Sequence, residues 1–185
     1  MQKGFPLLTA SLLFSVITET HAQPVGMGLH SWPKEKESGI SVDLMRNCCE
    51  KVEKDKRRIF YLNTRVFRMS MQIKGIYVRD GMMFFRLKLA NHSHLDYDVD
   101  SIRFFITDMR QSKKGLTRLN MLSPLYNYRD TRTIAGKSKQ DNVIVLPRFT
   151  LPLGKILLIE ASEKNGGRRL QLRADNFTLL RSRLI

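Results

Sequence analysis

Short segments in which apolar and polar residues alternate run through most of this chain, and they constrain its fold more than any other feature. In residues 82–90, Leu87 and Leu89 would face one side of a strand while Arg86 and Lys88 face the other. Alternation of this kind is typical of antiparallel strands with one face buried. We therefore expect a succession of half-buried strands.

Turn signals separate these segments. Asp80-Gly81 is typical of a tight hairpin, and Asn165-Gly166-Gly167 indicates a second one. About seven or eight short strands bounded by turns predict a mainly β protein, an antiparallel immunoglobulin-like β-sandwich. The strands are predicted over residues 67–73, 75–79, 82–90, 97–108, 143–150, 155–163, 168–174 and 177–180.

One amphipathic helix is predicted ahead of the strands, over residues 42–59. Apolar residues recur at helical spacing from Leu44 to Val52, and the opposite face is charged. Ser41 is the expected N-cap, because its hydroxyl can accept a hydrogen bond from a backbone N–H of the first turn.

The two cysteines, Cys48 and Cys49, are neighbours on this helix. So few cysteines exclude a disulfide scaffold and a zinc site built from several cysteines. A bridge between the two would be strained, because successive helical residues point in different directions. Two interpretations stay open: small core-facing residues, or an intermolecular disulfide in an oxidising compartment.

The first 22 residues resemble a secretory signal peptide. Lys3 supplies a positive charge, residues 7–17 are mostly apolar, and Thr20-His21-Ala22 ends in a small residue suited to cleavage. This pattern predicts a leader over residues 1–22, a linker over 23–40 and a helix-plus-sandwich domain over 41–185. It also predicts a periplasmic or cell-envelope location. The alternative is that residues 1–22 are the remnant of a truncated domain.

The chain is strongly basic, with 32 Lys and Arg against 17 Asp and Glu, a net charge of +15. Removing residues 1–22 would take away one Lys and one Glu, so the charge belongs to the remaining domain. Such a surface suits acidic proteins, anionic membranes or nucleic acid. No helix-turn-helix, zinc-finger or RNA-binding motif accompanies it, which favours protein docking and oligomeric assembly over direct DNA contact. The candidate docking residues lie in two basic loops: Arg110, Lys113, Lys114 and Arg118 in one, and Arg129, Arg132, Lys137 and Lys139 in the other.

The sequence lacks the nucleophile-elbow, P-loop and dinucleotide-binding motifs. We therefore expect no enzyme, no catalytic residues, no cofactor and no resident metal. Asp96, Asp98 and Asp100 open like a calcium loop, but its sixth and twelfth positions hold Ser101 and Thr107 instead of Gly and Glu. A cation- or sugar-binding envelope protein that uses these carboxylates is the weakest alternative.

Four segments in family order resemble the C-terminal domain of the TraN proteins of conjugative transposons: GIYV at 75–78, DVDSIRF at 98–104, LPRFTLP at 146–152 and EKNGGR at 163–168. The resemblance, with the helix, covers roughly residues 44–185. It implies a structural, non-enzymatic part of a type IV secretion-like DNA-transfer apparatus in the bacterial envelope, with other conjugation proteins as partners. The family's further β-rich domain between leader and helix has little room in this chain.

Overall fold

The structure, a computed structural model, describes residues 41–109 and 120–185. The predicted leader and linker, and the first basic loop with Arg110, Lys113, Lys114 and Arg118, lie outside the described residues. Residues Gly39–Ile185 belong to one unit of the chain, and the description below is of that unit.

Strands dominate the described part of the chain, with one helix ahead of them and a short one near the C-terminus. The elements are α1 (Val42–Lys54), β1 (Asn63–Val66), β2 (Met69–Arg79), β3 (Met82–Asn91), β4 (Tyr97–Asp108), β5 (Asn120–Leu122), β6 (Tyr126–Asn127), β7 (Thr133–Ile134), β8 (Lys139–Pro147), β9 (Lys155–Glu163), β10 (Arg169–Ala174), α2 (Asn176–Leu180) and β11 (Arg183–Leu184).

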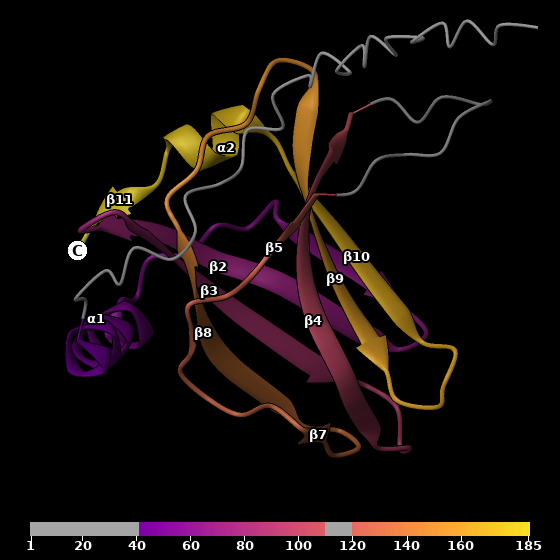
Figure 1. Cartoon of the computed structure of the whole chain (residues 1–185). Coiled ribbons are helices and arrows are strands. Elements are labelled where there is room, and N and C mark those ends of the chain that lie inside the picture. Colours follow the sequence, from indigo (N-terminus) through magenta and orange to yellow (C-terminus); the bar gives the residue numbers. More distant parts are fainter. Residues whose placement is uncertain (1–40, 110–119) are drawn as a thin grey trace, which may run out of the picture. The chain divides into compact units, whose positions relative to one another are not determined.

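The strands form two sheets that pack face to face (Figure 1). The first has the order β1-β2-β3-β8-β6, and β11 pairs in parallel with the far end of β2. The second has the order β10-β9-β4-β5, and β7 pairs with the start of β4. All other pairings are antiparallel. The predicted fold class, a mainly β antiparallel sandwich with one N-terminal helix, is confirmed.

The main core lies between the two sheets. Phe85 of β3 lies between Ile76 and Ile144 of its neighbouring strands, and its ring meets that of Phe104 in β4 at a centroid distance of 5.5 Å. Both phenylalanines are fully buried. The alternation predicted for β3 is therefore confirmed, since its odd-numbered residues from Met83 to Leu89 join this core.

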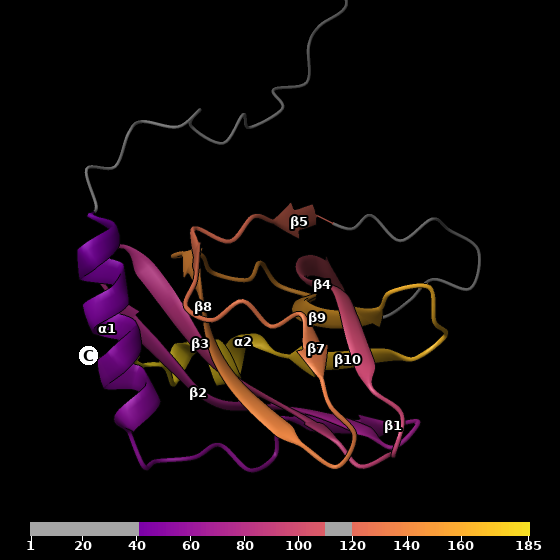
Figure 2. The ribbon, with the colours of Figure 1, turned by 90° about the horizontal axis from the view of Figure 1, so that it is seen from below.

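Helix α1 covers part of the outer face of the first sheet (Figure 2). Ser41 caps it as predicted, because its Oγ accepts a hydrogen bond from Asp43 N at 3.1 Å. The helix ends at Lys54, five residues earlier than predicted. The buried Arg86 of β3 donates to the carbonyl of Asp55 just beyond the last turn, which satisfies a backbone acceptor that the helix leaves unpaired.

The chain after α1 runs along the edge of β2 instead of continuing the helix. Ile59 N donates to Lys74 O at 2.8 Å, and Ile73 N donates to Leu62 O at 3.0 Å. These hydrogen bonds to the sheet replace the i to i−4 bonds that the charged sequence from Asp55 to Ile59 could have made.

The strand predicted over residues 67–73 is wrong at its start. Phe67 and Arg68 have φ angles of 51° and 59° and form the turn between β1 and β2. Strand β1 was not predicted, because its sequence is polar and mostly exposed. Strand β2 runs on past a bulge at Lys74 and joins two segments that we predicted as separate.

The hairpin predicted at Asp80-Gly81 is confirmed, and both residues adopt the positive φ that such a turn requires. The strands predicted over 97–108 and 155–163 have the observed bounds of β4 and β9. Strand β8 begins and ends earlier than the predicted 143–150.

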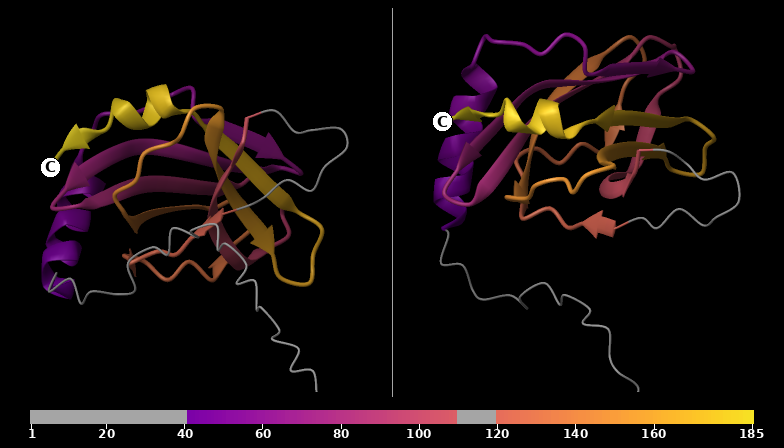
Figure 3. Two further views of the ribbon diagram at one scale, coloured as in Figure 1. Left: turned by 45° about the horizontal axis from the view of Figure 1, so that its top comes forward. Right: turned by 90° about the horizontal axis from the view of Figure 1, so that it is seen from above.

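The strand predicted over 177–180 is wrong, because these residues form helix α2. Asp175 caps this helix by accepting a hydrogen bond from Thr178 N at 2.8 Å. Its leucines are divided between a buried Leu179 and an exposed Leu180. Figure 3 shows α2 and β11 lying along the edge of the first sheet beside β2.

Candidate docking site

Strand β4 has a stretch of backbone that no other described strand pairs with on one edge. On that edge β7 covers Tyr97 and Asp98, and Val99 N donates to Arg132 O at 2.7 Å. Farther along, β5 covers Phe104 to Ile106. Within the described residues, 100–103 are therefore left open between the two short strands.

The backbone of Ile102 faces this open edge. On the opposite edge of β4, which faces β9, Met109 N donates to Gly154 O. Successive residues of a strand direct their backbone N–H and C=O groups to alternate edges. The register is regular from Ser101 to Asp108, so Ile102 presents its N–H and C=O to the open side. An edge of this kind is a template for pairing with another chain.

A groove of about 370 Å³ runs beside this edge, between β4 and the loop that joins β6 to β7. Ile102 and Ile144 give it an apolar part, and Asn142 gives a polar one. Arg129 and Arg132, two of the predicted docking residues, also line it. The structure therefore brings these two together with the open strand edge.

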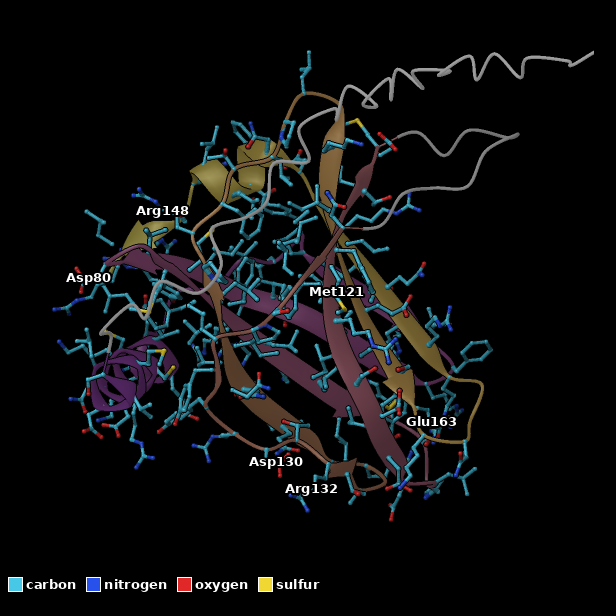
Figure 4. The ribbon with its side chains drawn as sticks, viewed as in Figure 1. Asp80, Met121, Asp130, Arg132, Arg148 and Glu163 are labelled. Carbon is cyan, nitrogen blue, oxygen red and sulfur yellow. The ribbon has the colours of Figure 1, made fainter. Side chains whose placement is uncertain are left out.

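Both arginines are held in ion pairs. Arg129 Nη2 lies 2.7 Å from Glu53 Oε1 of helix α1, and this pairing raises the pKa of Arg129. Arg132 pairs with Asp130 two residues before it, and Figure 4 shows the two side by side in the loop before β7. The loop thus presents cations that already have acidic partners, which the basic sequence alone did not indicate.

The other two described docking candidates lie elsewhere. Lys137 and Lys139 line a shallow depression with Lys88 and His92 at the far end of β3. Lys137 Nζ donates to His92 O at 3.0 Å. The second basic loop of the sequence is therefore split between two surfaces.

The three carboxylates that open like a calcium loop each have a different partner. Asp96 accepts from Gly136 N at 2.8 Å, and Asp98 accepts from Thr133 Oγ1 at 2.7 Å. Asp100 accepts from Ser162 Oγ at 3.2 Å and lies 3.8 Å from Arg103. In residues 41–109 and 120–185, no group of three or more His, Cys, Asp or Glu side chains is arranged to hold a metal ion.

Cys48 and Cys49 are both unbridged and buried beneath α1. They pack against the outer face of the first sheet, near Phe84 and Val145. Burial raises the pKa of the Cys49 thiol to about 12. The arrangement favours the core-facing interpretation, because neither sulfur reaches the surface of the unit.

One ion pair beside the second hairpin was not predicted. The Arg168 guanidinium donates through Nε to Glu163 Oε1 at 2.9 Å and also bonds the carbonyl of Asp96. It lies over the Tyr97 ring, 5.1 Å from its centre. Hydrogen bonding to Arg168 lowers the pKa of Glu163. No signal in the sequence distinguishes this structural arginine from the exposed ones around it.

The sequence model of the family described as "Domain of unknown function (DUF4138)" matches residues 42–184. No curated protein matches the chain. None of the helices in the described part of the chain combines the length and the apolar character needed to cross a membrane.

Proposed function

Since the chain belongs to the DUF4138 family, a domain family of unknown function, we propose a role for it from its geometry and its resemblance to TraN: a structural, non-enzymatic component of a conjugative DNA-transfer apparatus in the bacterial envelope. It acts by docking onto neighbouring subunits.

The open edge of β4 is the observation that carries this proposal. Docking by strand addition needs unpaired backbone groups, room for the added strand and side-chain pockets beside it. Within residues 100–103, Ile102 supplies the backbone groups, and the groove lined by Ile102 and Ile144 supplies the room and an apolar pocket. A partner strand would extend the second sheet between β7 and β5.

The arginines at the groove favour one kind of partner strand over another. The side chain of Arg129 is about half exposed, and that of Arg132 is mostly exposed. Their ion pairs are therefore weakly held and can exchange with carboxylates of a partner. A partner strand with acidic residues at its ends would then be favoured over a basic one.

The experiment is a mating assay with donors in which the gene for this protein has been deleted. A plasmid copy of the intact gene should restore transfer, and fractionation of these donors should place the protein in the envelope. Transfer that is unaffected by the deletion would overturn the proposal, as would a protein found only in the cytoplasm.

A second candidate, direct contact with nucleic acid, is favoured by a cationic cluster on the outer face of the first sheet. Lys88 lies among three other cations, Lys74, Lys139 and Arg58, and one acid, Asp141. The pKa of Lys88 is lowered, mainly by burial and also by repulsion from these cations. Phosphate groups would relieve that repulsion. A salt-dependent mobility shift with random duplex DNA that disappears in Lys88→Glu would support this role, and no shift at low salt would end it.

A further inference from the structure

Large apolar side chains are exposed both on the segment that follows α1 and on helix α2, which lies beside that segment. Phe60 and Tyr61 are 73% and 59% exposed, and Phe177 of α2 is 64% exposed. Leu180 and Leu184 nearby are also exposed. Single exposed apolar residues are common, but a group of them on neighbouring segments marks a surface that another molecule covers.

These segments border a groove. One part, of about 210 Å³, is lined by Ile59, Phe60, Gly75 and Ile76. A second part, of about 370 Å³, is lined by Leu62, Met109 and Ile156. Tyr61 and Thr178 line both parts, so the two parts adjoin each other between residues 58–62 and α2.

Arginines surround this groove. Arg58, Arg181 and Arg183 line the first part, and Arg173 lines the second. Asp175 is the one acidic residue among the described residues that line the groove, and its carboxylate is engaged as the cap of α2. Hydrogen bonding to Thr178 lowers the pKa of Asp175, so it stays ionised in that role. Asp55, outside the lining, lies 3.9 Å from Arg183.

We propose that this groove binds an acidic segment of a partner protein that carries an aromatic or aliphatic anchor residue. The four arginines match carboxylates in charge and in geometry, because a guanidinium can bond both oxygens of a carboxylate. The apolar floor, with Ile59, Ile76 and Leu62, accepts the anchor side chain.

A peptide fits the groove better than single-stranded nucleic acid does. Binding of single strands relies on open aromatic faces on which bases stack. The Arg181 guanidinium lies over the Phe177 ring, 5.1 Å from its centre, and covers one face of it, which leaves Phe60 and Tyr61 as the exposed aromatic rings at the groove. The floor is aliphatic, so it suits a side chain better than a base. The proposal does not depend on the role proposed for the β4 edge, because the two grooves share no lining residue.

The test measures fluorescence anisotropy with the full chain and three labelled probes. The first is a peptide in which Asp and Glu flank a Trp-Leu pair, the second has Lys in place of every acid, and the third is single-stranded oligothymidylate. We expect the acidic peptide to bind, the lysine peptide to fail, and any binding of the oligonucleotide to be insensitive to Arg181→Glu and Phe60→Ser.

Two charge reversals and one apolar substitution then locate the site. Arg58→Glu and Arg181→Glu should each weaken binding of the acidic peptide about tenfold or more, as expected for a charge-assisted contact worth about 1.4 kcal/mol or more. Neither arginine is in an ion pair with a described residue, so both variants should keep the fold. Phe60→Ser should weaken binding too, and Arg65→Glu, an exposed arginine of β1 outside the groove, should not.

Three results would overturn the proposal. They are no binding of the acidic peptide, equal binding of the acidic and lysine peptides, and acidic-peptide binding that Arg58→Glu, Arg181→Glu and Phe60→Ser leave unchanged. Oligothymidylate binding that is lost in the same three variants would assign the groove to nucleic acid instead.

Discussion

Arg129 donates from both Nε and Nη2 to one oxygen of Glu53, at 3.0 and 2.7 Å, and so ties the loop beside the β4 edge to helix α1. Helix α1 packs on the outer face of the first sheet, whereas the open edge belongs to the second. The pair therefore links the helix to the groove proposed for docking.

The Arg129–Glu53 pair should contribute little to stability, because both side chains are partly exposed and screened by water. In a double-mutant cycle with Arg129→Gln and Glu53→Gln, we expect a coupling of about 0.5 kcal/mol in urea denaturation. The coupling should shrink as salt is raised. A coupling above about 2 kcal/mol that salt leaves unchanged would show a buried pair instead.

The Glu163–Arg168 pair should matter more, because both side chains are mostly buried. Glu163→Gln removes the ionised acceptor of several hydrogen bonds, and we expect a loss of about 1.5–3 kcal/mol at neutral pH, measured by urea denaturation. Glu160→Gln, on the same strand, is the matched control and should lose less, since Arg169 lies 3.7 Å from Glu160 and is exposed.

The pH dependence of the same pair follows from the sign of its pKa shift. Arg168 holds the pKa of Glu163 in the folded protein below its unfolded value. The pair's contribution is therefore complete above about pH 5 and is lost as the pH falls through the folded-state pKa. Glu163→Gln should flatten this acid limb of the stability curve, and an acid limb identical to that of the unmodified protein would contradict the assignment.

Much of the fold could be predicted because local signals and tertiary structure agree there. Asp80-Gly81 permits the positive φ angles of its turn. The apolar residues that alternate along β3 are those on the face that packs against Phe104. The two main errors have different causes, one distant in the sequence and one local. Helix α1 ends early because Arg86, which lies 31 residues beyond Asp55, bonds the Asp55 carbonyl. Residues 177–180 are helical because Asp175 caps them, a signal that is local and visible in the sequence.

The candidate docking site was predictable only in part. The basic loop with Arg129 and Arg132 is visible in the sequence, but its pairing with Glu53 and its place beside Ile102 depend on how the sheets are ordered. The groove at Tyr61 joins segments about 115 residues apart in the sequence, so no sequence window contains both sides of it.

The thiols of Cys48 and Cys49 should react slowly in the native protein. Both are buried, and burial raises the pKa of Cys49 to about 12, which leaves almost no reactive thiolate at neutral pH. A colorimetric thiol reagent should label them only as fast as the protein opens, and both should react at once in denaturant. Rapid native labelling, or a disulfide-linked dimer on non-reducing electrophoresis, would favour the intermolecular interpretation.

The most direct test of the central claim uses Ile102 in the mating assay. Ile102→Pro removes the N–H that faces the open edge of β4, a change that edge strands tolerate, and Ile102→Val keeps that N–H as the matched control. Circular dichroism and thermal melting would first show that both purified variants are folded. In donors, we predict that Ile102→Val restores transfer to the level of the intact gene, while Ile102→Pro leaves it at the level of the deletion. A folded Ile102→Pro variant that restores full transfer would contradict docking at this edge.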